Sequence, residues 1–171
     1  ITFNAVISAL ARAGQAENAE SLLEEMYSDY LDGQNSAKPD VISFNTGLIA
    51  SSNATSHYAP ERPEAMLERM AQLYASGDMD TQPHIISYNS VINCWAKSGR
   101  KDAPDAALKL LRTMQQQYLA GDKSLRPNTI LYNKVLSAFV RAGQANRAKE
   151  IHEEMRTWEV SNTNELAKPE T

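Results

Sequence analysis

The chain has 171 residues, of which 42% are apolar and 22% are charged, and its formal net charge is −4. This composition excludes outright disorder and predicts a folded core. The acidic balance argues against a protein that coats nucleic acid through bulk positive charge, but it leaves room for a local basic seam. No apolar run approaches the roughly 18 residues of a membrane-spanning helix, so we expect no membrane contact.

A sequence period of about 44 residues runs along the chain. An asparagine after an aromatic residue recurs in the quartets ITFN, ISFN, ISYN and ILYN, as Asn4, Asn45, Asn89 and Asn133. Glycine, methionine and proline positions keep the same interval. The sequence therefore predicts four units, at about residues 1–40, 41–84, 85–128 and 129–171, and we expect them to be a fragment of a longer array.

Each unit is predicted to form two helices. The first carries apolar residues at i, i+3, i+4 and i+7, as in residues 3–10, 88–95 and 132–139, and closes at a glycine in units one, three and four. The second covers residues 19–30, 107–118 and 148–158 and ends near Gly33, Gly77, Gly121 and Asn162. One helical hairpin cannot bury its apolar stripes alone, so the expected fold is an all-α solenoid of four stacked helix-turn-helix repeats.

A polar seam is expected beside the buried stripe of each first helix, because residues four apart lie on one helical face. It runs from an amide to a cation in three units, ending at Arg12, Lys97 and Arg141, and in unit two it ends at Asn53. Stacking of the repeats would place the four asparagines in a row on one surface.

The segments ITFNAVISALARAGQAENAESLLEEM, IISYNSVINCWAKSG and TILYNKVLSAFVRAGQANRAKEIHEEM resemble pentatricopeptide repeats, and so does the closing proline with its following polar residue. The resemblance implies a protein of mitochondria or chloroplasts that binds single-stranded RNA, with one base per repeat read by two or three side chains. It also implies a role in RNA processing, stability, editing or translation, in which other RNA-processing proteins take part.

The same resemblance assigns roles to individual residues. It pairs Asn4 with Asp40 for uracil and Asn89 with Asn128 for a pyrimidine, while Asn45 with His84 and Asn133 with Glu170 depart from the usual pairs. It implies that each base lies between aliphatic side chains, here Ile1, Ile42, Ile86 and Ile130. It places the cations of the seam, Arg12, Lys97 and Arg141, near the phosphates.

Simpler interpretations stand beside these. The asparagines could make local backbone bonds, the isoleucines could be buried between units, and the cations could stabilise helix C-termini. The competing functional class is a protein-binding scaffold of the tetratricopeptide kind. We expect no enzyme activity, cofactor or metal, since HEEMR at residues 152–156 lacks the second histidine of a zinc-protease helix.

The connection from each second helix to the closing proline is longer than the family pattern. The surplus, such as YSDYLDGQNSAK, could extend the helix or form a loop. If it displaced Asp40 or Asn128 from the asparagines, the base-reading pairs would fail.

Overall fold

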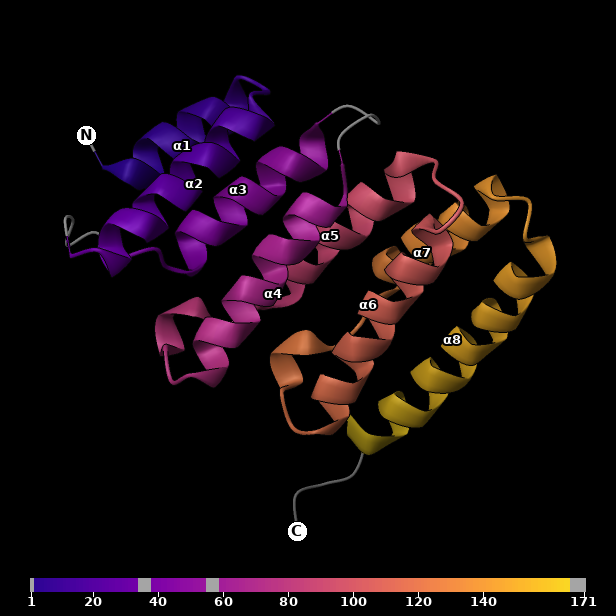
Figure 1. Cartoon of the computed structure of the whole chain (residues 1–171). Coiled ribbons are helices and arrows are strands. Elements are labelled where there is room, and N and C mark those ends of the chain that lie inside the picture. Colours follow the sequence, from indigo (N-terminus) through magenta and orange to yellow (C-terminus); the bar gives the residue numbers. More distant parts are fainter. Residues whose placement is uncertain (1, 34–37, 55–58, 167–171) are drawn as a thin grey trace, which may run out of the picture.

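The computed structural model describes residues 2–33, 38–54 and 59–166. Within them, α-helices pack side by side as four hairpins from one end of the molecule to the other (Figure 1). The first helices of the hairpins are α1 (Phe3–Arg12), α3 (Val41–Asn53), α5 (Ile85–Ser98) and α7 (Thr129–Arg141). The second helices are α2 (Ala16–Leu31), α4 (Glu61–Ala75), α6 (Ala103–Leu119) and α8 (Ala145–Leu166). The predicted all-α solenoid of helical hairpins is therefore confirmed.

The hairpins form two layers of helices. In the inner layer α1 packs on α3, α3 on α5, and α5 on α7. Each second helix packs on the first helix of its own hairpin and, in the outer layer, α2, α4 and α6 also pack on the first helix that follows. Among the described residues, consecutive second helices do not pack on one another in this way. We therefore call α1, α3, α5 and α7 the inner layer and α2, α4, α6 and α8 the outer layer.

The core lies between the layers and repeats with the sequence. The methionine of each second helix is buried, at Met26, Met70, Met114 and Met155. The aromatic residue before the recurrent asparagine is buried in three units, at Phe44, Tyr88 and Tyr132. Phe3 is partly buried and packs against the same core. The aromatic residue before each asparagine thus belongs to the core.

The helix ends follow the glycines, with one exception. Gly99 ends α5 in the left-handed conformation, with φ 67°, which a residue with a side chain adopts only at a cost. Gly33, Gly77 and Gly121 also have positive φ just after their helices. The prediction that Asn162 ends the last helix is wrong, because α8 continues through it to Leu166.

The connections after α4 and α6 fold into short turns that help to join neighbouring hairpins. The 3₁₀ helices η1 (Met79–Thr81) and η2 (Lys123–Leu125) follow α4 and α6, and Asp78 and Asp122 cap them. Lys38 Nζ lies 2.6 Å from Asp78 Oδ1, and Gln82 Nε2 donates to Asp122 Oδ2 at 3.1 Å. The residue before the closing proline thus bonds to the cap of the following unit in two successive connections.

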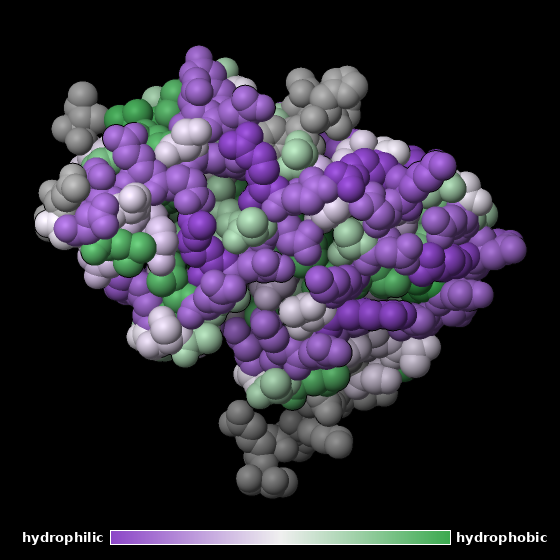
Figure 2. Space-filling view, in the orientation of Figure 1, coloured by the Kyte–Doolittle hydropathy of each residue, from purple (hydrophilic) through white to green (hydrophobic). Residues whose placement is uncertain are grey.

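Ion pairs join the helices of the outer layer. Arg62 Nε lies 2.9 Å from Glu20 Oε2, Arg147 Nη2 2.6 Å from Asp105 Oδ1, and Arg69 pairs with Glu24. The surface in Figure 2 is mostly hydrophilic, and its apolar side chains form small separate patches. Consecutive outer helices therefore contact one another through charged side chains, whereas the inner helices pack directly on one another.

Candidate nucleic-acid interface

The four recurrent asparagines lie near the start of the inner-layer helices, one on each of α1, α3, α5 and α7. Their exposure differs along the row. Asn45 is only 8% exposed, Asn4 and Asn89 are half-buried, and Asn133 is exposed. Each side chain therefore has its own hydrogen-bonding environment, which the shared motif does not reveal.

In unit one, Asn4 lies against Asp40 across the first inter-unit boundary. Asn4 Nδ2 donates to Asp40 Oδ1 at 3.5 Å, and the hydroxyl of Ser43 donates to Asn4 Oδ1 at 2.7 Å. The backbone N–H of Ser43 donates to Asp40 Oδ1 at 2.9 Å. Burial of Asp40 opposes ionisation, but these hydrogen bonds from Ser43 and Asn4 outweigh it and lower the pKa of the carboxyl. The predicted pair is thus in contact, and Ser43 is a third member that the sequence did not suggest.

Unit two repeats this arrangement with a histidine. The hydroxyl of Ser87 donates to Asn45 Oδ1 at 2.7 Å, and Asn45 Nδ2 lies 3.1 Å from His84 Nε2. Because the Asn45 oxygen is turned toward Ser87, the amide nitrogen of Asn45 faces the His84 ring. His84 Nδ1 is buried without a hydrogen-bond partner among the described residues.

Unit three does not join its two predicted residues. Leu131 occupies the place of Ser43 and Ser87 and has no hydroxyl to donate. Lys134 of α7 instead donates from Nζ to Asn89 Oδ1 at 2.6 Å. The side chain of Asn128 accepts from the backbone N–H of Leu131 at 3.0 Å and makes no hydrogen bond to Asn89 within the described residues. In unit four, Glu170 lies outside the described residues, as does Ile1 at the start of unit one.

The polar residue after each proline has a structural role as well. Asp40, His84 and Asn128 are the N-cap residues of α3, α5 and α7. The signal was present in the sequence, because a polar residue directly before an apolar helical run is typical of an N-cap. The predicted second residue of each pair is therefore also the residue that caps the first helix of the next unit.

The predicted base-stacking isoleucines are exposed. Ile42, Ile86 and Ile130 have 60%, 47% and 64% of their surface accessible, at the same place on α3, α5 and α7. The alternative that they are buried between units is therefore wrong. A single exposed isoleucine is unremarkable, but a regular row of them supplies apolar surface for a partner.

The predicted phosphate contacts also bind neighbouring helix ends. Lys97 Nζ donates to the carbonyl of Ser52 at 3.0 Å, and Arg141 Nη1 donates to the carbonyl of Ala96 at 3.0 Å. Each cation thus satisfies a C-terminal carbonyl of the preceding inner helix, which supports the structural interpretation. Both residues are nevertheless exposed, as is Arg12 at the end of α1.

Charge is separated between the two layers. The inner-layer helices contain no aspartate or glutamate, and their charged residues are Arg12, Lys97, Lys134 and Arg141. The acidic residues of the described helices lie in the outer layer, most densely on α2 and α8. The acidic net charge therefore conceals a basic inner layer.

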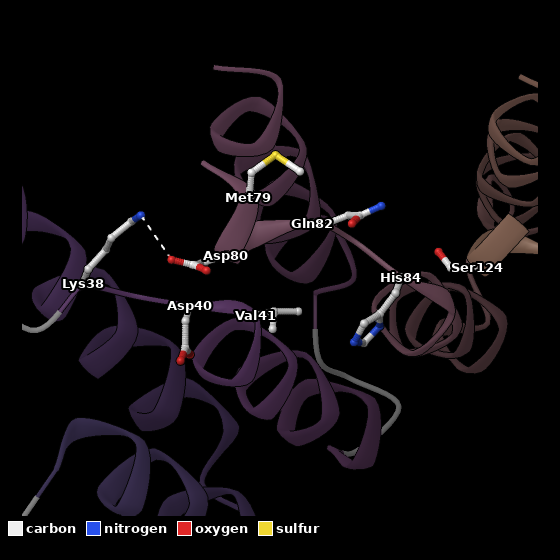
Figure 3. Close-up of a pocket in the computed structure, with 8 residues that line it drawn as sticks. All are labelled: Lys38, Asp40, Val41, Met79, Asp80, Gln82, His84 and Ser124. Carbon is white, nitrogen blue, oxygen red and sulfur yellow. Dashed lines mark ion pairs between the residues drawn. The ribbon is translucent and has the colours of Figure 1, made fainter. Parts of the chain in front are cut away.

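One pocket opens on this layer, and a second lies at the connections that precede α3 and α5. One, of about 330 Å³, is lined by Asn93, Ala96, Lys97, Ile130, Asn133, Lys134, Ser137 and Arg141. The other, of about 680 Å³, has Asp40 and His84 in its lining, with Lys38 and Asp80 paired at 3.9 Å at one end (Figure 3). The first combines an amide, an apolar side chain and cations, which is the chemistry a nucleotide requires.

Comparison with known families agrees with this arrangement. A model of the PPR repeat matches residues 1–30 and 86–118, and a model of the pentatricopeptide repeat domain matches residues 109–163. The chain belongs to the pentatricopeptide repeat family. Both matches leave out residues 31–85, yet the hairpin α3–α4 of this pentatricopeptide repeat array packs between its neighbours. No curated protein is similar enough to the chain to count as a match.

Other kinds of site find little support in the described part of the array. Its histidine, cysteine and acidic side chains form no group of three or more that could hold a metal ion. Burial raises the pKa of the Cys94 thiol to about 12, so this residue is not a reactive thiolate. None of the helices in the described part of the chain is both long and apolar enough to cross a membrane.

Proposed function

We propose that this pentatricopeptide repeat array binds single-stranded RNA along its inner layer and has no catalytic activity of its own in these residues. The observation that supports this proposal is the different charge of the two layers. The helices that bear the asparagine row contain cations and no acidic side chain, although the chain as a whole is acidic. A polyanion would therefore approach this layer in preference to the other.

The finer part of the proposal concerns the bases. Asn4 and Asp40 together present an amide donor and a carboxylate acceptor, which suits the N3–H and carbonyl groups of uracil. The exposed isoleucines supply apolar surface on which bases can pack. Sequence-selective, pyrimidine-leaning binding in organellar RNA processing, stability, editing or translation is the role we assign, and it draws on the family for the organelle.

The alternative is a protein-binding scaffold that uses the outer layer. A groove of about 860 Å³ between α6 and α8 is lined by Leu119 and Trp158 together with Glu150, Glu153 and Glu154. Such a groove fits a basic, partly apolar peptide better than it fits RNA. The two functions therefore place the partner on opposite layers.

Fluorescence anisotropy with labelled ten-nucleotide oligouridine and oligoadenine, each at two salt concentrations, tests the proposal. We expect binding that weakens with salt and favours oligouridine. The variant Asn89→Ala should weaken pyrimidine binding while its melting temperature stays close to that of the unsubstituted chain. As a matched control, Glu153→Ala in the outer groove should leave RNA binding unchanged. Failure to bind either RNA with the fold intact would contradict the proposal and favour the scaffold.

A further inference from the structure

Lys134 contacts a predicted base-reading residue but belongs to none of the predicted base-reading pairs. It lies on α7, directly after Asn133, and reaches back to the asparagine of the preceding unit. The equivalent positions on the other inner helices hold Ala5, Thr46 and Ser90, which are too short to make this contact. Unit three is thus the one described unit whose asparagine is bonded to a cation.

Resting on the proposed function, we infer that Lys134 is a specificity-determining residue that makes unit three select cytosine over uracil. Its ammonium lies 2.6 Å from Asn89 Oδ1, the one acceptor on that side chain. A donor such as the N3–H of uracil is repelled by the adjacent positive charge. The unprotonated N3 of cytosine is an acceptor and is attracted to it, whereas the O2 carbonyl is common to both bases and does not distinguish them.

The second residue of unit three reinforces this effect. The side-chain oxygen of Asn128 is engaged by the backbone N–H of Leu131, so its free group is the amide donor. In unit one the corresponding residue is Asp40, whose carboxylate offers a further oxygen to an N–H donor. Unit three therefore presents donors where unit one presents an acceptor.

Neighbouring side chains restrict the position of Lys134. It is half-buried and lines the pocket that also contains Ile130, Lys97 and Arg141. Desolvation lowers its pKa, and so does the nearby charge of Lys97. An ammonium held in such surroundings is an effective donor, because it has already lost part of its water shell.

The test compares the affinities of the whole chain for ten-nucleotide oligocytidine and oligouridine by fluorescence anisotropy. In Lys134→Met the Asn89 oxygen becomes a free acceptor, so the ratio of the oligouridine Kd to the oligocytidine Kd should fall by about threefold to tenfold, as expected for one hydrogen bond. The aliphatic stem of methionine preserves the packing. Lys134→Thr, which copies Thr46, should change the ratio in the same direction.

Lys97→Met is the matched control, because it removes a cation from the same pocket without touching Asn89. It should weaken both RNAs alike and leave the ratio unchanged. The inference is overturned if Lys134→Met binds RNA with the ratio unaltered and the melting temperature preserved, while the proposed function would stand. If the unsubstituted chain bound neither RNA, both would be overturned.

Discussion

At the residue scale, Asp40 shows how closely folding and the proposed recognition are combined. Its side chain caps α3 through Ser43 and also accepts from Asn4 of the preceding unit. Ser43 joins both contacts, since its hydroxyl donates to Asn4 at 2.7 Å and lies 2.8 Å from Asp40. A substitution at this position therefore acts on two units.

Replacement of Asp40 separates the two roles. Asp40→Ala removes the cap and should lower the free energy of unfolding by about 0.5–2 kcal/mol, measured by urea denaturation. Asp40→Asn keeps a good cap and should lose less stability than Asp40→Ala, but it should lose preference for oligouridine. If Asp40→Asn destabilised the chain as much as Asp40→Ala, the capping explanation would be wrong.

Asp40 also predicts a pH dependence. Because hydrogen bonds lower the pKa of this carboxyl in the folded state, its contribution is complete above the ordinary value of 3.8 and is lost as the pH falls through the lower folded value. Acid titration followed by circular dichroism should therefore show a smaller stability difference between the unsubstituted chain and Asp40→Asn at low pH than at pH 7. An equal difference at both pH values would contradict this account.

At the element scale, close packing fixes the inner helix α3 against both neighbouring outer helices. Gly47 lies in its middle, where a Cβ atom would come within 3.3 Å of the Met66 sulfur and 3.4 Å of a Leu23 methyl group. A glycine inside a helix is ordinarily unfavourable. Here its small size lets α2 and α4 approach α3.

Enlarging this residue should destabilise the hairpin. Gly47→Val is expected to lower the free energy of unfolding by about 1–3 kcal/mol through overpacking, measured by thermal and urea denaturation. Gly47→Ala should have a smaller effect, because the flexible ends of Met66 and Leu23 can shift and alanine favours the helix. Thr46→Val, half-exposed on the same helix, is the control. Equal stability of Gly47→Val and the control would show that the contact is loose.

The helices could be predicted from the sequence because each carries an apolar stripe. The repeat period also allowed corresponding residues of the four units to be compared. The asparagine row and its position on the inner helices followed from the same period. The hydrogen-bond partners did not, because they depend on residues outside the motif. Leu131 in place of a serine and Lys134 in place of a small residue alter unit three, and neither change disturbs the apolar pattern. The turn at η1 was equally hidden, since a short 3₁₀ helix has no periodicity to detect.

At the scale of the whole molecule, neighbouring helices contact one another differently within the two layers. The inner helices pack directly on one another, while ion pairs span the outer helices. The most buried of these charges is Glu20, which is 4% exposed and accepts from both Ser51 and Arg62. It joins the first hairpin to the second through α3 and α4.

Removal of its cation should weaken the array. Arg62→Met leaves the buried Glu20 carboxylate without its positive partner and should lower the free energy of unfolding by about 1–3 kcal/mol, measured by urea denaturation. Arg147→Met breaks an exposed outer-layer pair with Asp105 and should have a smaller effect that disappears at high salt. If both variants lost the same stability, burial of Glu20 would not be the cause.

The shared position of Asp40, His84 and Asn128 has a consequence for how such arrays can diverge. Each is the N-cap residue of the next unit's first helix as well as the second base-facing residue of its own unit in the proposed function. Side chains that begin helices well are few, chiefly aspartate, asparagine, serine and threonine. If the proposed function holds, the side chains that can change base preference at this position are therefore limited to those that also cap a helix. His84 is the one of the three that is not among the preferred capping residues.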